Sequence, residues 1–248
     1  MNKSLMLRVA AFALAFSLLA AACGGGSTDT GSDSTDSSSQ TSEATAPETE
    51  EDTATETESA AAPAVDTPAA TLTRDLTALL ADHEYLAGAS VLMAVQAKGD
   101  LKDPSFVAAA GALDKNSIAL SEAIASVYGK AGGEQFLSLW RAHIGFFVDY
   151  TLGQATGDKA MAAKAEKKLD GYRNDFGAFI EGATEGGLPA DAVADALTPH
   201  VDSTKDAIDS VVAGDGKAFD KLREAASHLP GIATALSGAI VTQFPDKF

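Results

Sequence analysis

The stretch Glu-Gln-Phe-Leu-Ser-Leu-Trp-Arg-Ala-His-Ile-Gly-Phe-Phe-Val-Asp-Tyr-Thr-Leu-Gly-Gln-Ala, residues 134–155, decides the fold class. Its large side chains recur at spacings of four, three, four and three residues, which places them on one face of an α-helix. They are Phe136, Trp140, His143, Phe147 and Tyr150. We therefore expect a helix whose apolar face carries a histidine.

The same periodicity continues on both sides of this stretch and is divided by turn signals rich in Gly, Asp and Pro. No run alternates with period two, so we predict an all-α domain over residues 71–248, a bundle of about six helices. The predicted helices cover residues 72–98, 104–128, 134–155, 159–182, 189–213 and 217–242. Pro199 and Pro230 are expected to kink the last two, or Pro199 to start a new segment.

An internal repeat relates these helices in pairs. Three similar pentapeptides each end in histidine, and a Gly-Asp turn follows each of them. The pentapeptides are residues 79–83, 139–143 and, more loosely, 196–200, and the turns are residues 99–100, 157–158 and 214–215. We predict three αα-hairpins of about 55–60 residues, each of which covers the apolar stripe of its neighbour.

The N-terminus has the composition of an export signal. Lys3 and Arg8 precede an apolar run over residues 9–22, which is too short to cross a bilayer but suits a cleaved signal peptide at 1–22. The only cysteine follows, and Ala20-Ala21-Ala22-Cys23 resembles the lipobox of bacterial lipoproteins, although its leucine lies one residue further back, at Leu19. We predict that Cys23 is acylated, with palmitate for example, and anchors the protein to the outer face of the membrane. A soluble secretory signal with an incidental cysteine is the alternative.

Residues 23–70 are predicted to be a disordered acidic linker. Residues 24–70 contain eleven acidic and no basic residues, with Val65 as the only large apolar side chain. Removing this −11 and the +2 of residues 1–22 from the total of −17 leaves −8 for the domain. Because no part of the chain offers a basic patch, we expect no nucleic-acid partner.

The residues that could carry chemistry are the histidines. Three of the four, His83, His143 and His200, occupy the same repeat position on apolar stripes. We expect them to converge and bind a divalent transition metal, zinc or copper, because neutral imidazole is the commonest ligand for these ions. His228 is a candidate fourth ligand. Three further residues are expected to support the ligands by hydrogen bonds: Asp82, Asn116 and Asp149.

Two alternatives remain open at this stage. The histidines could be structural, each bonded to a carbonyl or to Asn116, in a small-molecule or protein-interaction module. Such a module would have an apolar ligand pocket between hairpins, and the pocket walls would be formed by Trp140, Phe146, Phe147 and Tyr150. An enzyme that uses such a metal with an open coordination position is a weaker possibility, since the sequence contains no nucleophile elbow or phosphate loop.

Several short motifs resemble an uncharacterised bacterial all-helical family. The resemblance spans most of residues 75–248 and implies a helical fold in which the His and Asn positions belong to the family pattern; it implies no activity. The motifs are Asn116, Tyr128-Gly129, His143-Ile144, Asn174-Asp175, Phe179, His200 and the tail Gln243-Phe244-Pro245-Asp246-Lys247-Phe248.

Overall fold

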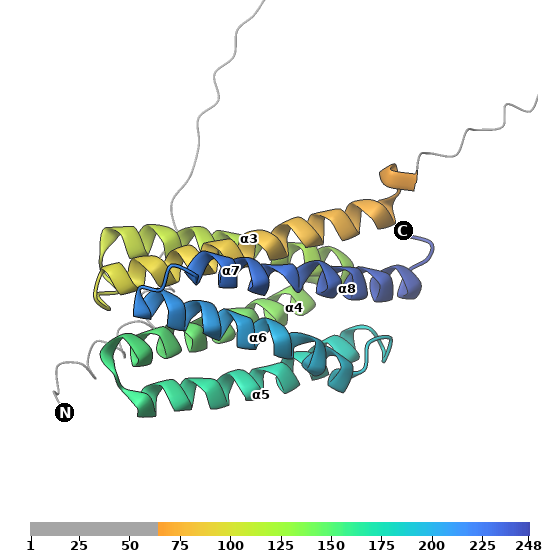
Figure 1. Ribbon diagram of the computed structural model, residues 1–248. Helices are drawn as coiled ribbons and strands as arrows, with labels where there is room; N and C mark the ends of the chain where they lie inside the picture. The colour runs from red at the N-terminus through yellow and green to blue at the C-terminus, as the bar shows by residue number, and fades with distance from the viewer. Residues whose placement is uncertain (1–63) are drawn as a thin grey trace, which may run out of the picture. The chain divides into compact units, whose positions relative to one another are not determined.

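The computed structural model describes residues 64–248, and all regular secondary structure in this part of the chain is helical (Figure 1). The all-α prediction is therefore confirmed. A short 3-10 helix η1 (Ala64–Asp66) precedes α3 (Pro68–Gln96), α4 (Pro104–Thr156), α5 (Lys159–Ala183), α6 (Ala190–Ala213), α7 (Ala218–Ser227) and α8 (Leu229–Gln243). The predicted signal peptide, Cys23 and most of the predicted linker lie outside the described residues.

The helix starts follow from local capping chemistry. Thr67 caps α3 by accepting a hydrogen bond from the Ala70 amide, and Asp158 caps α5 by accepting one from the Met161 amide. Pro68 at the first position of α3 has no amide hydrogen to leave unpaired. This cap is why α3 begins at Pro68 and not at residue 72, within what was predicted to be linker.

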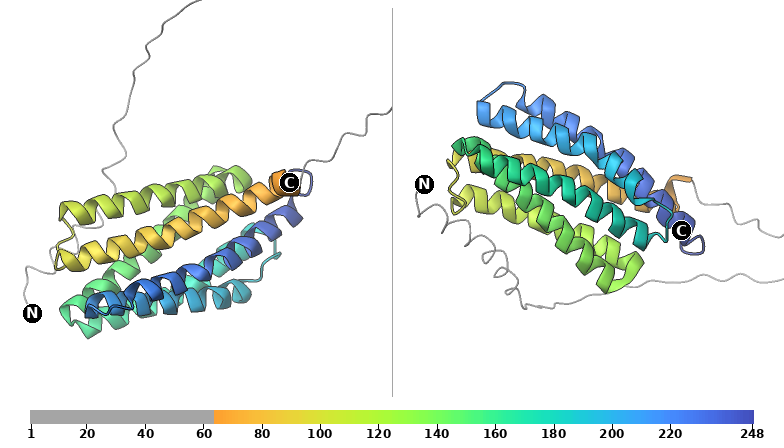
Figure 2. Two further views of the ribbon diagram at one scale, coloured as in Figure 1. Left: turned by 45° about the horizontal axis from the view of Figure 1, so that its top comes forward. Right: turned by 90° about the horizontal axis from the view of Figure 1, so that it is seen from below.

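The two helices predicted at 104–128 and 134–155 follow one another without a loop, so that both fall within α4. They are separated at Gly129, whose φ of 77° and ψ of 172° are not helical. The two segments pack closely beside this break, where the Ser121 hydroxyl donates a hydrogen bond to the Gly133 carbonyl. The chain turns back on itself here (Figure 2), and glycine is needed because a side chain strains a positive φ.

The two prolines in the C-terminal part have different effects. Pro199 lies inside α6, which continues through it, so the helical register of His200 is preserved. The predicted last helix is instead divided into α7 and α8 at His228, just before Pro230. A proline in the first turn of α8 is tolerated, because the first amides of a helix have no partner within it.

Helix α3 contacts more of the other helices than α5 does, and it lies at the centre of the helix packing. It touches α4, α6, α7 and α8, while α5 packs against α4 and α6 (Figures 1 and 2). By length and composition alone α3 could cross a membrane, but the core helix of a folded domain meets the same test. Its buried residues include Leu76, Leu80, His83 and Glu84, so its polar groups enter the interior together with the apolar ones.

The main core lies toward the end of the domain that contains the Gly129 turn. Aromatic rings of α4 and α5 pack there, with Phe136 stacked on Trp140 at 5.0 Å and edge-on to Phe176 at 5.9 Å between ring centroids. Buried side chains from five helices complete the cluster: Leu76, Leu80, Leu120, Ile124, Ile180, Leu197 and Leu229. This packing holds the histidine-bearing stretch of α4 against α3.

One glycine allows α5 and α6 to approach closely. A Cβ atom at Gly177 would overlap the backbone carbonyl oxygen of Ala190, whereas a Cβ at Gly171 on the same helix meets nothing within 4 Å. We predict that Gly177→Ala lowers the free energy of unfolding by about 2 kcal/mol, because the backbone must move apart. Gly171→Ala, the control, should raise it by up to about 1 kcal/mol. Urea unfolding checks both, and equal effects would contradict the close contact.

Candidate functional site

Two of the repeated histidines meet in the interior. His83 on α3 and His143 on α4 are buried, and their Nε2 atoms lie 3.3 Å apart. The Trp140 ring touches both imidazoles, at 4.7 Å from His83 and 4.6 Å from His143 between centroids, and Tyr172 stacks on His143 at 4.7 Å. The pair is thus held between aromatic rings, with the two Nε2 atoms directed at each other.

The polar atoms around this pair are poorly satisfied. Four buried polar atoms have no hydrogen-bond partner among the described residues: Nδ1 of His83 and of His143, the indole nitrogen of Trp140 and the hydroxyl of Tyr172. The His143 ring lies near the carbonyls of Leu139 and Trp140, which favour its protonated form, but its Nδ1 makes no well-formed hydrogen bond to either. Buried polar groups are normally paired, so a cluster of unpaired ones is unusual and marks a candidate site.

Burial keeps the histidines neutral. It lowers the pKa of His83 to about 3, with a further contribution from the nearby His200, and it lowers the pKa of His143 well below its ordinary value. His83 and His200 add to the lowering of the pKa of His143. The three imidazoles therefore lie close enough to affect one another, and at neutral pH each presents a ring nitrogen lone pair.

The third histidine is turned toward a carboxyl group. His200 on α6 has its Nδ1 3.3 Å from the carbonyl oxygen of Ala225 and its Nε2 3.8 Å from Oε2 of Glu84. Burial lowers the pKa of His200 to about 4. The Nδ1 contact with a backbone carbonyl leaves Nε2 as the nitrogen that faces the site, as in many metal-ligating histidines.

Glu84 is the residue that sequence reasoning missed. Its side chain is 1 % exposed, and within residues 64–248 its carboxyl oxygens contact the Thr204 hydroxyl at 3.4 and 3.5 Å and the His200 Nε2 at 3.8 Å. Burial raises the pKa of Glu84 to about 8, so the carboxyl is largely protonated at neutral pH. A signal was present in the sequence, because Glu84 follows Leu76 and Leu80 at spacings of four and so continues their buried stripe.

The four side chains do not yet form a complete coordination sphere. Among residues 64–248, no three His, Cys, Asp or Glu side chains converge closely enough as placed to hold a metal ion. The converging pair is His83 and His143, while His200 faces Glu84. Among the described residues the structure therefore does not show three imidazoles converging on one centre: two contact each other, and the third faces Glu84.

The predicted supporting residues lie elsewhere. Asp82 is exposed, and Asp149 forms an ion pair with Lys168 at 3.0 Å. Asn116 donates a hydrogen bond to the Leu79 carbonyl at 2.9 Å, which ties α4 to α3, and its Oδ1 has no partner. His228 is partly buried at the junction of α7 and α8 and is close enough to His200 to contribute to the lowering of its pKa.

Of the predicted pocket walls, Trp140 and Phe147 line cavities, whereas Tyr150 and Phe146 take part in other contacts. Tyr150 bonds through its hydroxyl to Asp209 at 3.0 Å, and Phe146 lies against the Lys168 ammonium; neither lines a cavity described here. Trp140 lines only a void of about 40 Å³ in the core, and Phe147 also lines a larger cavity. The walls of the larger cavity come from α3, α4, α6 and α7, because this cavity lies where the four helices meet.

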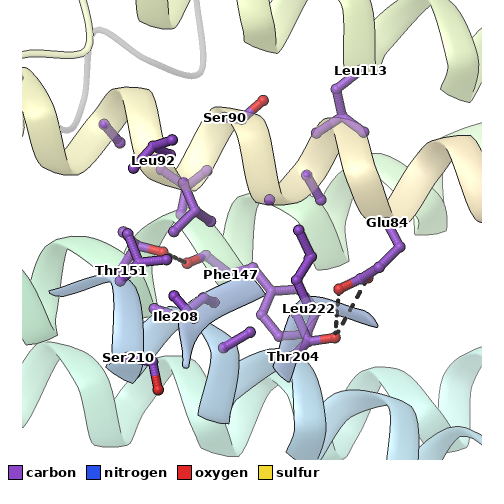
Figure 3. A pocket seen from close by; sticks show the side chains of 18 of the residues that line it. Glu84, Ser90, Leu92, Leu113, Phe147, Thr151, Thr204, Ile208, Ser210 and Leu222 are labelled. Atoms are coloured by element: carbon purple, nitrogen blue, oxygen red, sulfur yellow. Dashed lines mark hydrogen bonds between the residues drawn. The ribbon is translucent and has the colours of Figure 1, made fainter. Parts of the chain in front are cut away.

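This larger cavity has a volume of about 270 Å³. Its polar end is formed by His83, Glu84, His143, His200 and Thr204, and its remaining walls are mostly aliphatic. Figure 3 shows Glu84 facing Thr204 at this end, with Leu92, Ile208 and Leu222 among the apolar side chains. The histidine cluster therefore borders an open space and is not sealed within packed side chains.

Comparison with models of protein families, with curated proteins and with solved structures finds no match. The resemblance to an uncharacterised helical family therefore stays a prediction. Any functional conclusion must come from the site itself.

Proposed function

We propose that this domain binds a divalent transition metal, zinc or copper, through His83, His143 and His200, with Glu84 as the fourth ligand. The observation that carries the proposal is the separation of 3.3 Å between the Nε2 atoms of His83 and His143. Two nitrogens that each lie about 2.0–2.1 Å from one ion at a tetrahedral angle are about 3.3 Å apart. The same separation fits a hydrogen bond between the two neutral rings, so metal binding would move the shared Nε2 proton to Nδ1 and turn both lone pairs toward the ion.

The charge of the site also supports a cation. All three imidazoles are neutral lone-pair donors at pH 7, and the one acidic group buried beside them, Glu84, has no Lys or Arg partner within the described residues. A buried carboxyl is costly to ionise unless a positive charge accompanies it. A metal ion provides that charge, so its binding is expected to release the proton of Glu84.

The remaining step is a local rearrangement. His200 and Glu84 contact each other at 3.8 Å, and rotation of both side chains toward the His83–His143 pair would complete a set of three nitrogens and one oxygen. The adjoining cavity leaves room for this movement. Such a set is typical of zinc, and three nitrogens also suit copper.

Metal analysis of the purified chain from residue 24 onward tests the proposal. We expect about one zinc or copper per chain by elemental analysis after exposure to the ion and gel filtration. His83→Ala and His143→Ala should each lower the retained metal at least tenfold, because each removes one ligand of the converging pair. Asp82→Ala, at an exposed position next to His83, is the matched control and should retain full occupancy.

Far-UV circular dichroism of each variant separates loss of the site from loss of the fold. His228→Ala tests the candidate fourth ligand and should retain the metal if Glu84 fills that position. Wild-type protein that remains metal-free under these conditions, while folded, would remove the proposal.

We also propose that the domain is displayed outside the cytoplasmic membrane on a lipid at Cys23. The support is the apolar run at residues 9–22 followed by the single cysteine. Cys23→Ser should move the protein from the membrane fraction to the soluble fraction, because one residue carries all the predicted acyl chains. Fractionation with labelled palmitate measures this, and an unchanged membrane fraction would contradict it.

We infer further that the helices derive from three copies of one αα-hairpin. The support is that His83, His143 and His200, which share a repeat position, all border the same cavity. Superposition of residues 72–128, 134–182 and 189–242 should bring the three histidine Cα atoms into register. A superposition that fails to align them would remove the threefold repeat.

A further inference from the structure

The cavity of about 270 Å³ extends well beyond the space that a metal ion needs. An apolar cavity of about 150 Å³ can accommodate benzene, so this one can hold a single ring together with a short chain. Small side chains on facing helices leave the space open, among them Ala87 on α3 and Ala207 on α6. In a fully packed core, larger side chains would fill these positions.

The cavity reaches solvent at the turn between α6 and α7. Phe219, at the start of α7, lines the cavity and is 67 % exposed, and the exposed Asp215 lines it as well. A small molecule can therefore enter beside α7 and pass along the aliphatic walls to the polar end.

Apart from the histidines, the ionisable residues that line the cavity are acidic, and the buried Glu84 carboxyl, largely protonated when it is alone, is expected to ionise beside a cation. Glu84 at the inner end and Asp215 at the mouth are acidic, and none of the described residues that line the cavity is Lys or Arg. The Thr204 hydroxyl donates to the His200 carbonyl, and the Nδ1 of His200 faces the Ala225 carbonyl, so the Thr204 oxygen and the His200 Nε2 can accept hydrogen bonds from a ligand. The complement of such a cavity has an apolar body and a head that is positively charged and donates hydrogen bonds.

We infer that the cavity is a binding site for a small hydrophobic amine, whose ring or short chain lies between α3, α6 and α7 and whose ammonium group lies against Glu84. The inference does not depend on the metal, although both cations would use the same polar end. Zinc and the amine are therefore expected to compete.

Three probes of the same shape and different head charge test the inference on metal-free protein, from residue 24 onward, by isothermal titration calorimetry. They are 2-phenylethylamine, 2-phenylethanol and 3-phenylpropionate. The amine should bind at least tenfold more tightly than the alcohol, and the acid should not bind measurably. Glu84→Gln should remove the advantage of the amine and leave the affinity for the alcohol unchanged within about twofold.

Ala207→Leu tests the position of the apolar body, because Ala207 lines the cavity and is not one of the proposed ligands, so that a larger side chain there occupies the space of the ring. The Ala207→Leu protein should bind neither the amine nor the alcohol and should still bind zinc. If Ala207→Leu does not fold, Ala87→Leu on the facing helix α3 replaces it in the same experiment. The inference would be overturned if all three probes bound equally or if the amine did not bind. It would also be overturned if the amine still bound to the protein with leucine in the cavity. Amine binding by a protein that takes up no zinc would instead reject only the metal proposal.

Discussion

Saturating zinc is expected to raise the free energy of unfolding of this protein by about 4 kcal/mol when the free ion is at about a thousand times its dissociation constant. An ion that binds only the folded state stabilises it by mass action, and the site needs residues from three helices that come together only on folding. His83 lies on α3, His143 on α4 and His200 on α6. Denaturant unfolding with and without zinc measures the increment.

The increment, and not the absolute stability, is the informative quantity in the variants. His143→Ala removes a buried ring that stacks on Tyr172, so the metal-free protein is itself destabilised. Zinc should nevertheless add less than about 1 kcal/mol to this variant, while Asp82→Ala should show the full increment. An increment that is equal in the two variants would mean that the ion binds elsewhere.

The stability of the metal-free protein is expected to be highest at about pH 7. Folding lowers the pKa of His83 to about 3 and that of His200 to about 4. As the pH falls below 6.5 the unfolded chain therefore binds protons that the folded chain does not, and the free energy of unfolding decreases. Folding raises the pKa of Glu84 from 4.5 to about 8. As the pH rises above 4.5 the unfolded chain therefore releases this proton first, and the free energy of unfolding decreases. Because three lowered histidines outweigh one raised carboxyl on the acid side, the two trends meet close to neutrality.

Glu84→Gln isolates the alkaline side of this profile. Between pH 6 and pH 8 the wild-type protein should lose about 2 kcal/mol more stability than the variant, because the unfolded chain releases the Glu84 proton more readily. The glutamine keeps a similar size and cannot ionise. Urea unfolding at the two pH values gives the difference, and parallel profiles for the two proteins would show that Glu84 is already charged in the folded state.

Much of the fold could be predicted from local signals. The period of the apolar residues and the glycine turns located most helix ends, since caps such as Asp158 and Gly157 act through their immediate neighbours. The prediction failed where distant packing determines the outcome. No local signal showed that Gly129 alone would connect two helices, which depends on how closely Gly133 can approach Ala125.

For the site, the sequence indicated which side chains face the interior but not how they meet. The stripes placed His83 and His143 on buried faces, and the structure brings their Nε2 atoms to 3.3 Å. Asp82 is adjacent to His83 in the sequence, but adjacent residues on a helix point about 100° apart, and Asp82 is exposed. Glu84 does not stand out in the sequence, because a charged residue is seldom buried without a partner.

By itself, the sequence determined that the domain is helical and that its few histidines lie on apolar faces, because both properties depend on spacing along one helix. Tertiary structure alone decided that α3, α4 and α6 bring three imidazoles and a carboxyl to one cavity. The physical reason is that the distance between side chains on different helices depends on how those helices pack. That packing is set by all the residues between them and not by the pattern of any single helix.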